Sequence, residues 1–166
     1  MNNPGRNNSD FLNDNKEHEL YLAVRARDLG KVKFILRNDQ EVKNLLPTID
    51  VWFPGFMQDP LHHAACNGYD EIITELLIAG AKINSYTKYS EDINMTPLHC
   101  AVKYRRLQTI QMLFTYGANC WLKGSFAEWT AQGAITYEGT PLEFAETMED
   151  DELVSIMLTH RENHGT

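Results

Sequence analysis

Four segments of the chain share one pattern of apolar positions. When the segments are aligned on Leu20, Leu61, Leu98 and Leu142, each has an alanine three residues later. Each also has a valine or isoleucine twelve residues later, and two further apolar residues at fifteen and sixteen. The first spacing places leucine and alanine on one face of a short helix, and the later positions form a stripe on a second helix. The pattern therefore predicts a repeated pair of short helices.

Helix-boundary residues agree with this register. Asp59-Pro60, Thr96-Pro97 and Thr140-Pro141 directly precede three of the leucines. Asp and Thr side chains cap the free backbone donors of a first turn, and proline fits the position that follows. Gly80 and Gly117 come after the second helices, where glycine adopts the left-handed conformation that ends a helix. One helix pair cannot bury its apolar face alone, so we expect the pairs to stack.

Two of the segments resemble the ankyrin-repeat signature. The resemblance rests on residues 59–68 (DPLHHAACNG), on residues 96–102 (TPLHCAV) and on residues 80–84 (GAKIN), which resemble the end of a repeat. It implies an all-α ankyrin-repeat solenoid of about four helix-turn-helix repeats with long inter-repeat loops. The ankyrin domain is expected over 17–161, with repeats near 17–58, 59–94, 95–138 and 139–161. Residues 1–16 are expected to form a flexible N-terminal tail, and 162–166 a C-terminal tail.

The first and last repeats depart from the family pattern. Glu19 replaces the usual proline before the first leucine, and Arg27 stands where the second repeat has Gly68. In the fourth repeat Glu146 occupies a normally small, apolar position. Terminal repeats meet water on one face, so these departures are typical of end caps. Arg105 takes the glycine position in the third repeat, which affects the expected geometry of its turn but not the fold.

The connections between repeats are long. The leucine spacings are 41, 37 and 44 residues, against about 33 in an ankyrin repeat. Loops on a rigid scaffold often carry binding residues, and aromatic side chains are frequent anchors at protein interfaces. The sequence therefore predicts partner-binding aromatics at Trp52, Phe53, Phe56, Tyr86, Tyr89, Trp121, Phe126 and Trp129. The alternative is that these loops fold back over the edge of the core; the polar, glycine-rich surroundings of Trp121 and Trp129 favour exposure.

A second predicted binding surface follows the first helices. On the concave face of such a stack we expect Lys103, Tyr104, Arg105 and Arg106 to contact a partner. The acidic run that ends in Glu149-Asp150-Asp151-Glu152 lies beyond them. A basic middle beside an acidic end could orient a partner electrostatically, but such a run is also typical of a solvated end face.

Composition and motifs point away from several other functions. The net charge is −8, so the chain does not have the excess of basic residues that is typical of nucleic-acid binding. The glycines form no phosphate-binding loop, and the sequence has neither a Gly-x-Ser-x-Gly nor a His-Glu-x-x-His motif. By the resemblance, His62 and His99 make structural hydrogen bonds rather than bind metal. We predict no enzyme activity, cofactor, metal or small-molecule substrate. We also expect no membrane segment, and three dispersed cysteines favour the reducing cytoplasm or nucleus.

The predicted function is a non-catalytic protein–protein interaction module. We expect an adaptor or regulatory subunit that binds one folded partner. Small ankyrin-only proteins include inhibitors of cyclin-dependent kinases, so the resemblance implies a protein kinase or kinase-linked complex in cell-cycle control as the first expected partner. One alternative is a viral or bacterial ankyrin effector that masks a host transcription factor. An alternative from another class is an enzyme with an unrecognised site.

Overall fold

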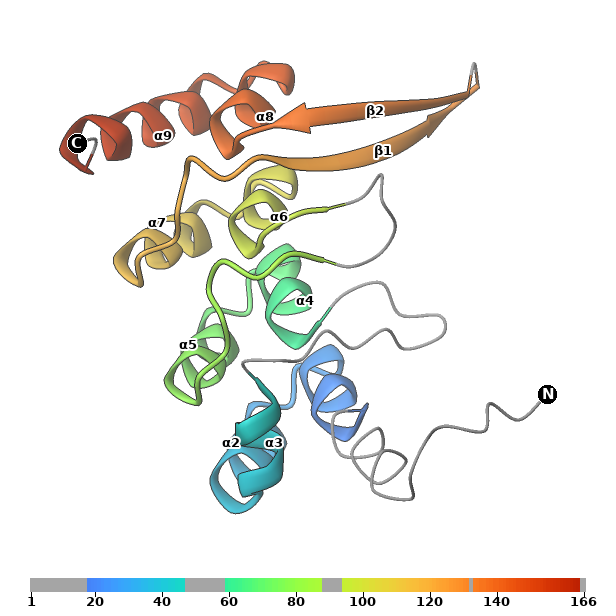
Figure 1. Ribbon diagram of the computed structural model, residues 1–166, viewed down its shortest axis with the longest axis vertical. Helices are drawn as coiled ribbons and strands as arrows, with labels where there is room; N and C mark the ends of the chain where they lie inside the picture. Colours follow the sequence, from blue (N-terminus) through green and yellow to red (C-terminus); the bar gives the residue numbers. More distant parts are fainter. Residues whose placement is uncertain (1–17, 47–58, 88–93, 132, 165–166) are drawn as a thin grey trace.

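The computed structural model describes residues 18–46, 59–87, 94–131 and 133–164. These residues form a stack of helical hairpins that ascends from the N-terminal to the C-terminal end of the chain (Figure 1). Each predicted helix-turn-helix repeat forms one layer. The first helix of every repeat lies in one column and the second helix in another. The predicted all-α solenoid is confirmed.

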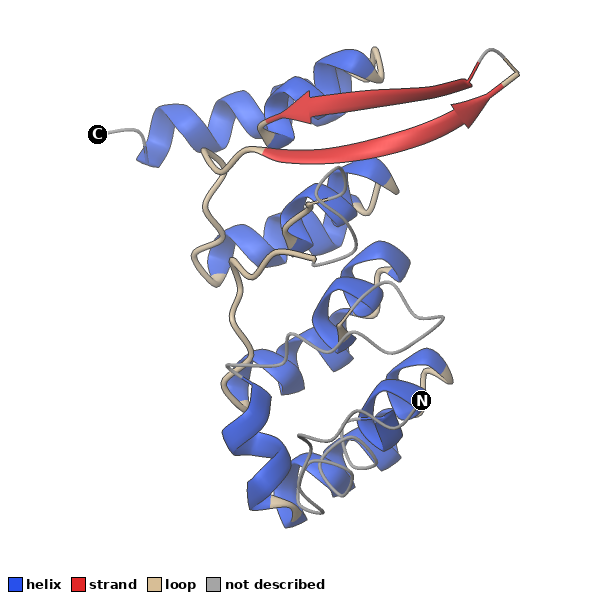
Figure 2. Ribbon diagram, turned by 45° about the vertical axis from the view of Figure 1, so that its right-hand side comes forward, coloured by secondary structure: helices blue, strands red, loops and turns tan. Residues whose placement is uncertain are grey.

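Each repeat contributes a pair of helices, and the first repeat contributes a third, α3. The helices are residues 18–25, α2 (Leu29–Asn38), α3 (Gln40–Leu45), α4 (Pro60–Asn67), α5 (Asp70–Ile78), α6 (Pro97–Lys103), α7 (Leu107–Thr115), α8 (Pro141–Thr147) and α9 (Asp151–His164). In one column α6 packs between α4 and α8, and in the other α5 packs between α2 and α7. Figure 2 shows these layers from a second direction.

The core lies where the apolar pattern predicted it. Leu20, Leu61, Leu98 and Leu142 are at most 5% exposed. The four alanines three residues later are also buried, which lets neighbouring helices approach closely. Residues at the twelfth position are buried in the first three repeats. The register taken from the sequence is therefore the register of the stack.

The predicted N-caps are confirmed. Asp59 accepts a hydrogen bond from the backbone N–H of His62 at 2.9 Å. Thr96 and Thr140 accept the equivalent bonds at the starts of α6 and α8. Each caps an otherwise unpaired donor of the first turn. These three caps fix where the first helices of the later repeats begin.

The third connection differs from the predicted loop. It contains an antiparallel hairpin of β1 (Gly124–Thr130) and β2 (Gly133–Gly139), paired from Gly124 with Gly139 to Thr130 with Gly133. Aromatic and β-branched residues favour the extended backbone of both strands. The hairpin reaches well beyond the helices (Figure 1). An insertion expected to be irregular is thus an ordered, projecting ribbon.

Two further helical segments extend the predicted repeats. α3 follows α2 directly, because Asp39 ends α2 and caps α3 by accepting from the N–H groups of Glu41 and Val42. α9 continues to His164, past the predicted boundary at residue 161. No helix within the described ranges is long and apolar enough to cross a membrane.

Candidate protein-binding surface

We use the term inner surface for the side of the stack formed by residues 18–25, α4, α6, α8 and the β1–β2 hairpin. Large apolar side chains are exposed at the ends of two of its helices, Tyr104 at 47% and Met148 at 39%, and Ile135 of β2 is exposed at 46%. Tyr104 follows Leu98 by six residues, and Met148 follows Leu142 by six. They therefore occupy equivalent positions in two adjacent repeats. Exposed apolar side chains on a rigid framework are suitable anchors for a protein partner.

Met148 was not among the predicted binding residues, although the repeat register could have found it. It takes the place in the fourth repeat that Tyr104 has in the third, at the end of the first helix. Its neighbours in sequence, Glu149 and Asp150, are acidic. An apolar residue at this position in consecutive repeats was the available signal.

Lys103 joins the inner helices to the hairpin. Its Nζ lies 3.6 Å from the ring centroid of Phe126 and 3.9 Å from Oε1 of Glu128. Burial lowers the pKa of Lys103, and the nearby carboxylate of Glu128 opposes that shift in part. The side chain is therefore engaged within the protein, and it fixes the position of β1 against α6.

Phe126 corrects one prediction. We expected it to contact a partner, but its side chain is only 5% exposed. Its ring stacks on Tyr137 at 4.9 Å and meets Phe144 edge-on at 4.9 Å. Strand alternation turns Phe126 toward α8, so the ring belongs to the core. It orders the hairpin instead of binding a neighbour.

The second and third connections are attached to each other. The Tyr86 hydroxyl donates to the carbonyl of Lys123 at 2.9 Å, and Tyr86 is half-buried. Asn94 and Ser125 exchange two backbone hydrogen bonds of 2.9 Å. The base of the second connection therefore extends the hairpin by one bridge. The described ends of the second connection are therefore hydrogen-bonded to the third connection.

Two histidines support the bases of these connections. Nε2 of His62 lies 2.9 Å from the carbonyl oxygen of Met95 and 3.1 Å from that of Ser85. Its Nδ1 lies 2.8 Å from a carboxylate oxygen of Asp59. Because both ring nitrogens face acceptors, this geometry favours the protonated ring. Burial opposes that charge, but the carboxylate of Asp59 outweighs it and raises the pKa of His62.

His99 is the neutral counterpart in the next repeat. Its Nε2 donates to the carbonyl of Gly139 at 3.1 Å, and its Nδ1 lies 2.8 Å from Oγ1 of Thr96. Burial lowers the pKa of His99 to about 4. Both histidines thus make the structural hydrogen bonds that the resemblance implied, one charged and one neutral.

Arg105 and Arg106 are turned toward the protein itself. Arg105 contacts Asp150 at 2.6 Å and Glu152 at 2.5 Å, and its hydrogen bond lowers the pKa of Asp150. Arg106 donates through Nε to the carbonyl of Cys66 at 2.9 Å. The basic middle and the acidic end therefore compensate each other across two repeats. These guanidinium groups stabilise the stacking of turns and are not a free cationic patch.

The remaining predicted aromatics divide into two groups. Trp121 is 51% exposed, and the guanidinium of Arg161 lies 4.1 Å from its ring centroid. Half of this indole surface is therefore open, in agreement with the predicted exposure. The side chain of Trp129, like residues Trp52, Phe53, Phe56 and Tyr89, lies outside the described part of the structure.

The described residues were compared with the needs of a metal site and of a nucleophile. Within these ranges no group of three or more His, Cys, Asp and Glu side chains is placed to hold a metal ion. Cys66, Cys100 and Cys120 are buried and take part in no disulfide. A hydrogen bond with Cys66 and burial both raise the pKa of Cys100, which keeps its thiol protonated and a poor nucleophile.

Comparison with known proteins gives a family model and partial similarity to two proteins. A family model of ankyrin repeats, in three copies, matches residues 20–124. A putative ankyrin repeat protein of Rickettsia bellii is 26% identical over 121 residues, which cover 63% of this chain and 49% of that protein. A glycerophosphocholine phosphodiesterase of Schizosaccharomyces pombe is 34% identical over 100 residues, which cover 60% of this chain and 8% of the enzyme. The chain thus spans half or less of the length of these relatives.

Proposed function

Since the chain belongs to the ankyrin-repeat family, whose repeats form protein–protein interaction modules, we propose that it is a non-catalytic adaptor or regulatory subunit. It binds one folded partner through its inner surface. The observation that carries this proposal is the pair Tyr104 and Met148, exposed at equivalent positions on adjacent first helices.

The hairpin gives the inner surface a fixed wall. Lys103, Phe126 and Phe144 pack it against α6 and α8, and Tyr86 ties it to the second connection. A surface that is ordered before binding loses less conformational entropy when a partner docks. The exposed half of Trp121 lies beside Arg161 of α9 and is a further candidate anchor outside the inner surface.

A protein kinase or kinase-linked complex in cell-cycle control is the first partner class to test. Its support is the resemblance of the repeats to those of small ankyrin regulators. We also place the protein in the cytoplasm, with the nucleus as the other compartment. The three buried cysteines, none of them in a disulfide, support a reducing environment.

A second candidate is an ankyrin effector that masks a host transcription factor. The similarity to the putative ankyrin repeat protein of Rickettsia bellii favours it, because that relative is bacterial. The two candidates share the inner surface and differ in the partner that it holds. Partner identification therefore separates them.

The test uses the double variant Tyr104→Ala with Met148→Ala. Immobilised protein is incubated with native extract, and bound proteins are quantified by mass spectrometry. We expect a stoichiometric kinase or kinase-linked protein on the unaltered chain, and a loss of at least about tenfold on the variant. Phe34→Ala is the matched control, because Phe34 is 67% exposed on the outer helix α2.

Three results would count against this reading. Retention of the partner by the inner-surface variant, with loss on Phe34→Ala, would move the site to the outer helices. Recovery of a transcription factor would favour the second candidate. If the protein captured no partner and instead converted a small molecule, both binding candidates would be wrong and the protein would be an enzyme.

A further inference from the structure

The C-terminal end of the stack presents a helix face that no described helix covers. In the second repeat, Asp70 accepts a hydrogen bond from Thr109 at 2.5 Å, and Thr74 lies 3.6 Å from the sulfur of Met112. This side of α5 therefore faces the next repeat. Leu61 and Leu142 are 81 residues apart, so the same side of the fourth repeat begins at Asp151 on α9.

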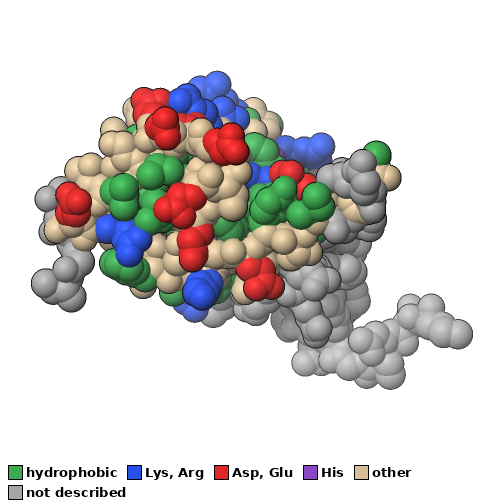
Figure 3. Space-filling view, turned by 90° about the horizontal axis from the view of Figure 1, so that it is seen from above, with side chains coloured by type: hydrophobic (Ala, Val, Ile, Leu, Met, Phe, Trp, Pro, Cys, Tyr) green, Lys and Arg blue, Asp and Glu red, His purple; other side chains and the backbone are tan. Residues whose placement is uncertain are grey.

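An apolar stripe runs along this face. Leu158 is 43% exposed, whereas its equivalent in the second repeat, Leu77, is partly buried against the core. Val154 is half-buried, whereas its equivalent Ile73 is fully buried. Val154 and Leu158 are four residues apart and so are neighbours on the surface of α9. Figure 3, which looks onto this end, shows hydrophobic patches between acidic side chains.

A further repeat of the same kind is a poor occupant for this face. Glu146 is exposed at the position where the second and third repeats have Ala65 and Val102, both fully buried. Stacking another helix pair here would remove the Glu146 carboxylate from water without a built-in partner, which is costly. The face is therefore suited to a partner that brings positive charge.

The charge of this end is strongly one-sided. Between residues 140 and 164 there is a single Lys or Arg, Arg161, against seven acidic residues: Glu143, Glu146, Glu149, Asp150, Asp151, Glu152 and Glu162. Two of these carboxylates, Asp150 and Glu152, are paired with Arg105. Glu146, Glu149, Asp151 and Glu162 are exposed. Exposed carboxylates around an apolar stripe complement lysine and arginine around apolar residues.

We propose that this C-terminal end face binds a basic amphipathic segment of a partner protein. Its apolar side chains lie on the Val154–Leu158 stripe, and its lysine and arginine side chains meet the surrounding carboxylates. The surface is distinct from the inner surface, so a partner could contact both or only one. Different residues carry the two proposals, and different variants test them.

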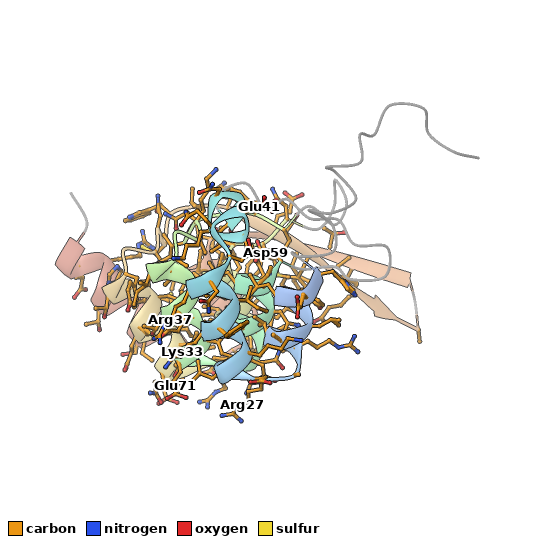
Figure 4. The ribbon with its side chains drawn as sticks, turned by 90° about the horizontal axis from the view of Figure 1, so that it is seen from below. Arg27, Lys33, Arg37, Glu41, Asp59 and Glu71 are labelled. Carbon is orange, nitrogen blue, oxygen red and sulfur yellow. The ribbon has the colours of Figure 1, made fainter. Side chains whose placement is uncertain are left out.

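A second copy of the chain is a poorer match. Two copies joined through this face about a twofold axis would bring like charges together. Residues 18–46, at the opposite end, hold six Lys and Arg against four acidic residues, and Figure 4 shows Arg27, Lys33 and Arg37 on one side beside Glu71. However, Arg27 lies over Tyr69 at 5.3 Å, and Lys33 lies 3.5 Å from Glu75. Part of that charge is already engaged within one copy.

The test measures binding of two labelled peptides to the full chain by fluorescence anisotropy. One peptide is an amphipathic helix of leucine and lysine, and the other replaces each lysine with glutamate. We expect the basic peptide to bind, with an affinity that falls as salt rises, and the acidic peptide not to bind. Leu158→Ser should weaken binding about tenfold because an apolar contact is lost.

Charge variants and a matched control complete the design. Glu146→Gln with Glu162→Gln should weaken binding about threefold and reduce its salt dependence. Ile78→Ser is the control, because Ile78 is 72% exposed on α5 and away from this face. Circular dichroism checks that each variant keeps its helices.

Several outcomes would overturn the proposal. These are no binding of the basic peptide, an unchanged affinity in Leu158→Ser, or an equal loss in Ile78→Ser. Sedimentation that shows a dimer of the unaltered chain, lost in Leu158→Ser, would assign the face to a second copy. None of these results changes the outcome expected for Tyr104 and Met148.

Discussion

At the scale of single residues, three turns between paired helices place a charged residue in the left-handed conformation. Arg27, Arg105 and Glu149 have φ of 55°, 53° and 53°, at the position where Gly68 has 74°. The sequence left the geometry of these turns open, since none of the three is glycine. The structure shows that each keeps the glycine-like turn despite its side chain. A left-handed backbone at a residue with Cβ is strained.

Glu149→Gly should therefore stabilise the protein. We expect a gain of about 0.5–1 kcal/mol in the free energy of unfolding, because relief of strain exceeds the added entropy of the unfolded chain. Urea unfolding followed by circular dichroism measures it. The reciprocal change Gly68→Ala should destabilise, because its Cβ would also lie 3.2 Å from Cδ of Arg106. A loss of stability in Glu149→Gly would show that the turn is unstrained.

The two signature histidines predict a dependence of stability on pH. The pKa of His99 falls to about 4 in the folded protein from 6.5. As pH drops below 6.5, the unfolded state therefore takes up a proton that the folded state does not. Stability should fall by about 2 kcal/mol between pH 6.5 and about pH 5. Urea unfolding at a series of pH values measures this slope.

His99→Gln provides the control for that slope. Glutamine can still donate to Gly139, so the variant should fold and lose most of the dependence between pH 6.5 and about pH 5. His62 contributes in a different window, because its pKa is raised. Its stabilisation is present below 6.5 and is lost as pH rises through its folded pKa. An unchanged slope in His99→Gln would assign the acid sensitivity to another group.

At the scale of elements, structure that depends on residues close together in sequence could be predicted, and structure that depends on distant contacts could not. The helix pairs were predictable because leucine, alanine and the later apolar stripe recur in four segments. The β1–β2 hairpin was not, because its contacts are distant in sequence. Phe126 packs on Phe144, and His99 reaches Gly139 across 40 positions. Composition suggested a binding loop, while tertiary packing ordered it.

Gly124 allows the hairpin to lie close to α6. A Cβ at this position would lie 2.7 Å from the backbone oxygen of Asn94 and 2.9 Å from Nε2 of His99. Gly124→Ala should therefore displace β1 and destabilise the protein by about 1–3 kcal/mol. Gly30→Ala is the control: it lies in α2 with only an ordinary 3.4 Å contact, so it should stabilise by about 0.5–1 kcal/mol. Similar stability of both variants would mean that β1 can shift to make room for the added Cβ at little cost.

At the scale of the whole molecule, the candidate binding surface was only partly predictable. Trp121 is exposed, as its surroundings indicated, and Tyr104 is exposed at the end of α6. Arg105, by contrast, finds its partners Asp150 and Glu152 at 45 and 47 positions away, in the next repeat. Charge runs in a sequence show which residues are present but not which of them meet. In repeat proteins the pairing of charges is hard to predict from sequence, because stacking brings together residues that are one repeat apart.

The stacked architecture also predicts how stability is distributed along the chain. α4 and α6 have a neighbouring repeat on both sides, whereas residues 18–25 and α9 have one neighbour within the described stack. Because repeat stability depends on nearest-neighbour interfaces, the end repeats should open without global unfolding. Hydrogen exchange should therefore be slowest in α4 and α6 and faster at both ends. Leu98→Ala, which removes a buried side chain at the centre, should accelerate exchange throughout the stack, whereas Leu20→Ala should accelerate it mainly in the first repeat. Equal protection in all four repeats would mean that the chain unfolds as one cooperative unit, with no independent fraying of its ends.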